Sequence, residues 1–247
     1  MRLNMKLLEI ENLSKAFGGV LAVNRVSFNL NQGEVLGLIG PNGAGKSTLF
    51  NIITGIFKPD TGTIRFNKRD ITGIAPYKIC QSGIARTFQL VKPFSRLTPL
   101  ENVMVGRAYG GQPARNIRQA RMESAQILAL TGLGDKRVRV AGMLSLADCK
   151  RLEIARALAT RPHLLLLDEM MAGLNPAELD DAIQLIKAIR DSGISLIVVE
   201  HVMKVIMGIS DRVIVLKVGE KIADGTPHEV ARDRQVIEAY LGEKPLC

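Results

Sequence analysis

Tryptophan is absent from this sequence of 247 residues, and all aromatic residues together make up 4% of it. With so few aromatic side chains, the protein has little with which to stack the bases of a single-stranded nucleic acid, so we expect no such surface. Its three cysteines, Cys80, Cys149 and Cys247, are odd in number and lack metal-ligand spacing. They indicate reduced thiols in a cytosolic protein rather than a disulfide framework.

Long apolar runs are also missing. No stretch reaches the roughly 18 consecutive apolar residues that a membrane-spanning helix needs. The first residues, MRLNMKLLEIENL, lack the apolar core and cleavage site of a secretory signal, so we expect no export. The net charge of +9 is compatible with binding to nucleic acid, to an anionic membrane surface or to a polyphosphate ligand. The net charge alone does not distinguish between these three partners.

Short β-rich runs and turn signals dominate the first 70 or so residues. The predicted strands there are 7–13, 26–30, 34–40 and 63–67. From 164 onward strands and helices alternate, which favours a parallel α/β sheet. The predicted elements there are strands 164–169, 194–201 and 212–219 and a helix over 177–193.

The stretch between these two parts, 90–157, is helical, with a clear helix over 114–133. We therefore predict one α/β domain whose nucleotide-binding core is formed by 1–89 and 158–223. A helical subdomain over 90–157 is inserted into this core, and a helical tail over 224–247 follows it.

One glycine-rich segment fits the pattern G-x-x-x-x-G-K-[ST] and stands between a predicted strand and a predicted helix. Its residues are Gly40, Pro41, Asn42, Gly43, Ala44, Gly45, Lys46, Ser47 and Thr48. Glycines let backbone N–H groups curl around phosphate oxygens, and the following helix adds its positive N-terminal end. Lys46 supplies a charge to the outer phosphates, and the Ser47 hydroxyl can bind Mg²⁺. The segment predicts a nucleotide site; an ordinary glycine-rich turn is the alternative.

Two acids close the apolar run LLLLDE. Asp168 is a candidate magnesium ligand, and Glu169 is a candidate base that orients an attacking water. Alone, the run suits a strand that merely ends in polar residues, but a phosphate loop upstream favours the catalytic interpretation. Three more candidates are weak individually: Phe17 for stacking on adenine, Gln89 after a strand, and His201 for reaching a γ-phosphate.

The order of these features resembles the ATP-binding subunits of ABC transporters over nearly the whole chain. The resemblance implies ATP and Mg²⁺ as ligands and ATP hydrolysis as the activity. It makes Phe17 the adenine-stacking residue, Asp168 and Glu169 the Walker B pair, and His201 the switch histidine. Gln89 becomes the Q-loop residue, a magnesium ligand that senses the membrane partner. The implied fold is an ABC-type P-loop ATPase with a RecA-like parallel-sheet core, an N-terminal antiparallel β subdomain and an inserted helical subdomain.

Several segments narrow the resemblance to the branched-chain amino acid importer ATPases of the LivG type. They are RTFQ, TPLENV, RLEIARAL, AGLNPAE, MGISDRVIVL and DGTPHEV. The insertion after TPLENV is shorter than in many of that group, so the substrate is left open between branched-chain amino acids and related small amides. AGLNPAE, at 172–178, resembles the D-loop region, with Asn175 where many members have aspartate.

The segment MLSLADCKRLEIARAL, at 143–158, departs from the family signature LSGGQ. Ser145, whose hydroxyl would bind the γ-phosphate of the opposite subunit's ATP, is retained, and Asp148 is common in the branched-chain group. Ala147 replaces a glycine, which costs ~1 kcal/mol if a positive φ is required there. We therefore predict a signature that is weakened but working, with an inactive signature as the alternative.

The resemblance also implies partners and a location. Transmembrane permease subunits and a second ATP-binding subunit, identical or different, would bind the chain, and a periplasmic or extracellular binding protein would act indirectly. The chain would then be peripheral on the cytoplasmic face of the inner membrane, without nucleic acid. The alternatives are an ABC ATPase of nucleic-acid repair or translation and a weakly hydrolysing regulatory subunit. The chain lacks the coiled-coil insertion or tandem cassettes of the first, and Glu169 and His201 argue against the second.

Overall fold

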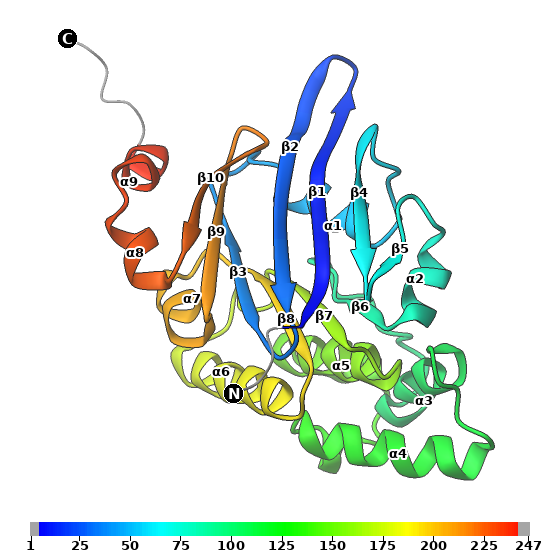
Figure 1. The fold of residues 1–247 in the computed structure, drawn as a ribbon. Helices are drawn as coiled ribbons and strands as arrows, with labels where there is room; N and C mark the ends of the chain where they lie inside the picture. Colours follow the sequence, from blue (N-terminus) through cyan, green and yellow to red (C-terminus); the bar gives the residue numbers. More distant parts are fainter. Residues whose placement is uncertain (1–4, 242–247) are drawn as a thin grey trace. The chain divides into compact units, whose positions relative to one another are not determined.

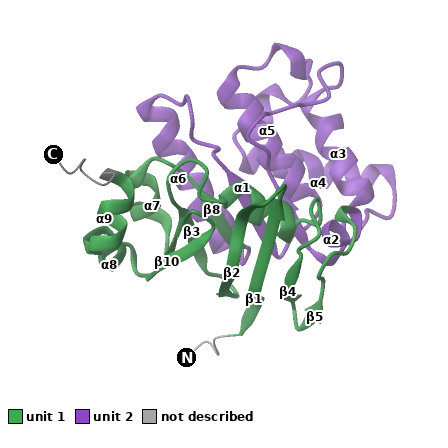
Figure 2. Cartoon of the chain, turned by 90° about the horizontal axis from the view of Figure 1, so that it is seen from above, with its two compact units in different colours: residues 1–76, 195–247 green, residues 77–194 purple. Residues whose placement is uncertain are grey.

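The computed structural model describes residues 5–241. The chain forms two compact units, which Figure 2 shows in two colours. Unit 1 comprises residues 1–76 and 195–247, and unit 2 comprises residues 77–194. Both predicted limits of the helical insertion, at 90 and 157, lie inside unit 2. The strand and helix predicted over 164–169 and 177–193 therefore group with the helical block rather than with the first unit.

Unit 1 is built mainly of strands (Figure 1). Its strands are β1 (Lys6–Phe17), β2 (Val20–Asn31), β3 (Val35–Ile39), β4 (Thr61–Phe66), β5 (Arg69–Asp70), β8 (Ser195–Val199), β9 (Arg212–Lys217) and β10 (Glu220–Gly225). Its helices are α1 (Lys46–Ile53), α7 (Met203–Ile209), α8 (Pro227–Arg232) and α9 (Arg234–Leu241). The N-terminal strands form an antiparallel sheet in the order β2-β1-β4-β5. In the other sheet of the unit, β3 pairs in parallel with β8 and with β9, and β10 pairs antiparallel with β9.

The burial of β3 and β8 explains their sequences. Every residue of VLGLI in β3 and of SLIVV in β8 is buried. A parallel strand covered on both faces needs such a continuous apolar run, whereas the antiparallel β2 alternates between buried and half-buried positions in its second half. The glycine-rich loop therefore follows directly after a strand that is buried along its whole length and paired on both sides.

Unit 2 combines a short parallel strand pair with helices. Its elements are α2 (Pro76–Ser82), which starts at the unit boundary, β6 (Ile84–Arg86), α3 (Pro99–Tyr109), α4 (Ile117–Leu130), α5 (Leu146–Ala159), β7 (Leu164–Asp168) and α6 (Pro176–Asp191), with short 3-10 turns at 134–136 and 141–143. Helices α3, α4 and α5 lie together in Figure 1 and share one apolar core. Its buried members are Leu100, Val103, Leu128, Leu133, Ala141, Leu152, Ala155 and Ala159.

The predicted elements are present. The strands expected at 164–169, 194–201 and 212–219 are β7, β8 and β9, and the helices expected at 114–133 and 177–193 are α4 and α6. Helix α5, Leu146–Ala159, begins inside the signature segment 143–158. The helical tail is present as α8 and α9, and residues 242–247 of that prediction lie outside the described part. Among the described residues, no helix has both the length and the apolar character needed to cross a membrane.

Candidate functional site

The glycine-rich loop of unit 1 runs from the end of β3 to the start of α1. Gly40, Gly43 and Gly45 have φ values of 149°, 78° and 101°. A Cβ atom on Gly40 would lie 2.1 Å from the carbonyl oxygen of Leu216, and one on Gly45 would lie 2.3 Å from that of Ala22. At these two positions both the backbone conformation and the close approach of another chain segment require glycine.

Lys46 is the first residue of α1 and is only 6% exposed. Its ammonium donates hydrogen bonds to the carbonyl oxygens of Gly40, at 2.7 Å, and Pro41, at 3.0 Å. The charge is therefore held against its own loop, beside the N–H groups at the start of the helix. Ser47 is exposed and Thr48 is half-buried in the same turn. A cradle of backbone N–H groups with a fixed cation and a helix N-terminus fits a polyphosphate.

His201 lies at the same edge of the unit 1 sheet as this loop. Leu38 of β3 and Val199 of β8 are neighbours in the parallel register. Gly40 and His201 each stand two residues beyond these neighbours, and the carboxyl ends of parallel strands meet at one edge. The structure therefore brings the loop and the exposed His201 to a common edge, where ligands of open α/β sheets bind.

Phe17 lies on the other sheet of unit 1, at the end of β1. Its side chain is 42% exposed and meets the Phe57 ring edge-on, with centroids 5.1 Å apart. The Lys15 ammonium is 5.5 Å from the centroid of the Phe17 ring. A half-exposed ring braced by another aromatic ring suits stacking on a planar ligand.

In unit 2, Gln89 and Glu169 are in direct contact. Strands β6 and β7 are parallel, with Arg86 opposite Leu166, and each of the two side chains lies three residues further on. The Gln89 Nε2 group donates to Glu169 Oε2 over 2.6 Å. Glu169 has a φ of 51°, in the left-handed region that few non-glycine residues adopt. Backbone strain of this kind clusters at functional sites.

Asp168 ends β7 and is 4% exposed. Its Oδ2 accepts a hydrogen bond over 2.6 Å from Nη2 of Arg86, which is buried with it, and its backbone N–H donates to Thr87 Oγ1 over 3.2 Å. Sequence reasoning missed both partners. The only available signal was their position in RTFQ, directly before Gln89.

The signature segment of unit 2 forms the start of α5. The Ser145 hydroxyl is the N-cap and accepts a hydrogen bond from the Asp148 backbone N–H, at 3.2 Å. The Asp148 carboxylate pairs with the Lys136 ammonium at 2.6 Å. Burial opposes the charge of Asp148, but its bonds to Lys136 and Ser145 outweigh burial, and its pKa is lowered.

Ala147 is a helical residue of α5, and it is not among the described residues that have a positive φ. The positive φ on which a cost at Ala147 depended is therefore not adopted in this structure, because the helix starts one residue before the position where the family has glycine. The chain still offers the Ala147 N–H at a helix N-terminus, and Ser145 and Leu146 are exposed beside it. The prediction of a weakened signature loses its structural premise.

Asn175 is the N-cap of α6 in a capping box with Glu178. Its side chain accepts from the Glu178 N–H over 3.0 Å, and its own N–H donates to Glu178 Oε2 over 2.9 Å. Asparagine and aspartate cap helices about equally well, so the replacement of aspartate leaves this end of the helix intact.

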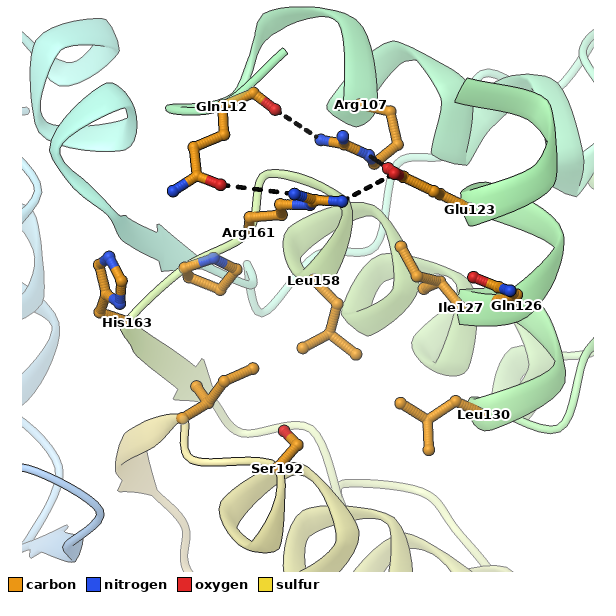
Figure 3. Close-up of a pocket in the computed structure, with 12 residues that line it drawn as sticks. Arg107, Gln112, Glu123, Gln126, Ile127, Leu130, Leu158, Arg161, His163 and Ser192 are labelled. Carbon is orange, nitrogen blue, oxygen red and sulfur yellow. Dashed lines mark hydrogen bonds and ion pairs between the residues drawn. The ribbon is translucent and has the colours of Figure 1, made fainter. Parts of the chain in front are cut away.

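A pocket of about 450 Å³ lies elsewhere in unit 2 (Figure 3). One side carries Arg107, whose Nε is 2.5 Å from Glu123, and Arg161, whose Nη2 is 2.7 Å from the same carboxylate. His163 also lines it and directly precedes β7, whereas Asp168 ends that strand. The pocket is thus at the opposite end of β7 from Glu169 and is separate from the candidate catalytic groups.

A phosphate loop between a buried strand and a helix, a strand-end Asp–Glu pair and an inserted helical block together define an ATP-binding cassette. The chain belongs to the ABC transporter family, which it matches over residues 23–172, and it is an ATPase of that family. Residues 220–244 match a second family, described as "Branched-chain amino acid ATP-binding cassette transporter".

Full-length relatives support this assignment. The chain is 41% identical to the high-affinity branched-chain amino acid transport ATP-binding protein BraF of Pseudomonas aeruginosa, covering 96% of this chain and 98% of that protein. It is also 41% identical to LivG of Salmonella typhimurium, a protein with the same description, covering 98% and 100%. Crystal structures of ABC transporter cassettes in a nucleotide-free and an ADP conformation each superpose with a TM-score of 0.88 at 34% identity, covering 97% of this chain and 100% of theirs. The predicted fold class is confirmed.

Proposed function

We propose that this ATPase powers the import of branched-chain amino acids or related small amides. The observation that carries the proposal is the match of residues 220–244, which include β10, α8 and α9, to the family described as "Branched-chain amino acid ATP-binding cassette transporter". The relatives that are 41% identical over almost the whole chain are named for the same transport. Unit 1 therefore carries both the phosphate loop and the segment that points to the substrate class.

The residues of unit 1 bind the nucleotide. The N–H groups of Asn42 to Thr48 surround the phosphates, and Lys46 exchanges its bonds to the loop carbonyls for bonds to the outer phosphates. The Phe17 ring stacks on adenine. His201, at the same sheet edge as the loop, donates to the γ-phosphate as charge develops there.

The residues of unit 2 carry the chemistry. Glu169 orients the attacking water and accepts its proton as the base. Gln89 holds the Glu169 carboxylate through its amide nitrogen, over 2.6 Å. The Ser145 hydroxyl and the N–H groups at the start of α5 close over the γ-phosphate of an ATP bound by the second subunit.

Mg²⁺ accompanies the nucleotide. The donors that we assign to it are the Ser47 hydroxyl, the Gln89 amide oxygen and, through water, the Asp168 carboxylate, all oxygen ligands of the kind Mg²⁺ prefers. The Gln89 bond to Glu169 uses the amide nitrogen, so the amide oxygen is left for the metal. When bound, Mg²⁺ neutralises charge on the β- and γ-phosphates.

The proposed assembly contains a second ATP-binding subunit, identical or different, and transmembrane permease subunits. It places the chain at the cytoplasmic face of the inner membrane, with a periplasmic or extracellular binding protein delivering the substrate. Each ATP is then bound between the phosphate loop of one subunit and the Ser145 segment of the other. Hydrolysis therefore requires the two subunits to come together.

The ATPase part of the proposal is tested with the purified chain. Lys46→Ala should abolish ATP binding, whereas Glu169→Gln should keep binding and remove most turnover. Lys221→Ala, which changes a lysine of the same unit in an exposed pair with Asp224, is the control and should behave as wild type. Turnover per chain should rise with protein concentration, and first-order turnover across a wide dilution series would contradict dimer closure.

The substrate part needs cells. Uptake of labelled leucine should fall in a strain that lacks this chain and return with the wild-type chain but not with Glu169→Gln. Unchanged uptake of leucine, isoleucine, valine and small amides, with the ATPase intact, would refute the substrate class and leave the enzyme assignment standing.

A further inference from the structure

The segment 88–94, which follows β6 and contains Gln89, is held to helix α5 at two points. Glu153 of α5 accepts a hydrogen bond from the Phe88 backbone N–H at 2.6 Å. Arg156 of α5 donates to the carbonyl oxygen of Lys92 at 3.1 Å, and its guanidinium lies 4.7 Å from the centre of the Phe94 ring. Residues three apart lie on one face of a helix, so Glu153 and Arg156 contact both ends of the segment from the same face of α5.

Burial of the Glu153 carboxylate at this position costs free energy. It is 7% exposed, and its Oε2 is buried without a hydrogen-bond partner among the described residues. Burial raises its pKa, against the opposing charges of Arg156, Arg86 and Lys150. A half-satisfied buried carboxylate costs more than an apolar side chain of similar size. The contact that the carboxylate does make, to Phe88, is therefore the feature that needs an explanation.

A continuous series of contacts runs from the Glu153 and Arg156 contacts with segment 88–94 to the candidate catalytic base, Glu169. Ser145 caps α5 about two turns before Glu153, so the start of the signature helix and the clamp belong to one rigid element. Phe88 is the neighbour of Gln89 in the chain, and Gln89 donates to Glu169 at 2.6 Å. A displacement of α5 is thereby passed to the segment that holds the Glu169 carboxylate.

We propose that Glu153 and Arg156 are positioning residues that clamp segment 88–94 to α5, so that the position of the signature helix determines whether Gln89 orients Glu169. The inference rests on the proposed role of Glu169 as the base. It adds two residues that neither bind nucleotide nor contact Glu169 themselves. They act through the backbone of the segment between β6 and α3.

Hydrogen exchange of the full chain tests the clamp without any hydrolysis. In Glu153→Leu, which removes the acceptor at similar volume, the amides of 88–94 should exchange about tenfold faster, as expected for loss of a hydrogen bond to a charged group. Glu153→Gln keeps a carbonyl acceptor and should retain most of the protection. Arg156→Met should expose the far end of the segment in the same way. Arg151→Met is the matched control, because Arg151 is on α5 but pairs with Asp181 at an exposed site.

Unchanged exchange of 88–94 in both Glu153→Leu and Arg156→Met would overturn the proposal. So would a Glu153→Gln variant as unprotected as Glu153→Leu, or faster exchange spread evenly over 77–194, which would mark a purely structural role. If Glu153→Leu fails to fold, Arg156→Met carries the test alone.

The kinetic arm separates positioning from nucleotide binding. Arg156→Met should lower kcat for ATP by about tenfold with KM changed by less than about twofold, because the phosphate loop in unit 1 is untouched. An equal loss in Arg151→Met, or a rise in KM with kcat unchanged, would overturn the proposal. If the wild-type chain hydrolyses no ATP, the proposed function fails, while the exchange result still decides whether the clamp exists.

Discussion

Replacing Ala147 by glycine distinguishes between two accounts of the signature segment. If the Ala147 backbone were strained, Ala147→Gly would increase the rate of ATP hydrolysis, since removal of ~1 kcal/mol of strain would raise turnover by up to about fivefold. The structure instead has Ala147 as the second residue of α5, without a positive φ. Glycine then only loosens the first turn of the helix, at a cost between about 0.5 and 1 kcal/mol.

We therefore expect Ala147→Gly to lower the midpoint of urea unfolding slightly and to leave turnover unchanged or reduced. Ala177→Gly is the matched control, because Ala177 is the second residue of α6 and is exposed. The two variants should lose similar stability. A severalfold increase in steady-state ATP hydrolysis by Ala147→Gly, with no such increase in Ala177→Gly, would show that the working conformation has glycine-like backbone at this position and would refute the reasoning.

Two further predictions concern buried charges in unit 2. Glu123→Gln should lower the free energy of unfolding by about 3 kcal/mol, because Arg107 is 1% exposed and its charge would lose its partner. Arg161→Met removes the exposed partner of the same carboxylate, and it should lower the free energy of unfolding by about 1 kcal/mol or less in the same denaturation series. The lowered pKa of Asp148 gives stability that is present above the ordinary value of 3.8 and is lost as the pH falls through the folded value. Wild type should therefore be more stable than Asp148→Asn at about pH 6, with the difference shrinking toward about pH 3, and a constant difference would show that Lys136 contributes nothing through charge.

The parts of the site that the sequence predicted are those whose residues act within one short segment. The pattern of glycines with Lys46 is contained in residues 40–48, although the close approaches that also require Gly40 and Gly45 come from Leu216 and Ala22. Strand β3 is recognisable from the run VLGLI. Strand β7 ends at Asp168 for the same kind of reason. Such features follow from neighbouring residues, so pattern and elementary chemistry are sufficient to predict them.

The contacts that were missed join distant segments. Arg86 and Asp168 are 82 positions apart, and Phe88 and Glu153 are 65 apart. Nothing in the local sequence pairs an arginine at the end of one strand with an aspartate at the end of another, or a helix glutamate with a loop N–H. The positive φ considered at Ala147 could not be judged from the sequence for a related reason. The start of a helix depends on its cap and its packing as well as on the residue at that position.

The left-handed backbone of Glu169 has a consequence for protein engineering. Glycine adopts a φ of 51° without the penalty of about 1 kcal/mol that a side chain incurs, so Glu169→Gly should melt at a higher temperature than Glu169→Ala, which loses the same bond to Gln89 but keeps the strain. A screen that selects only for relief of this strain would thus discard the group that we assign as the base. Relief of strain and turnover are opposed at this residue, and a stabilised version of the protein has to be selected on both.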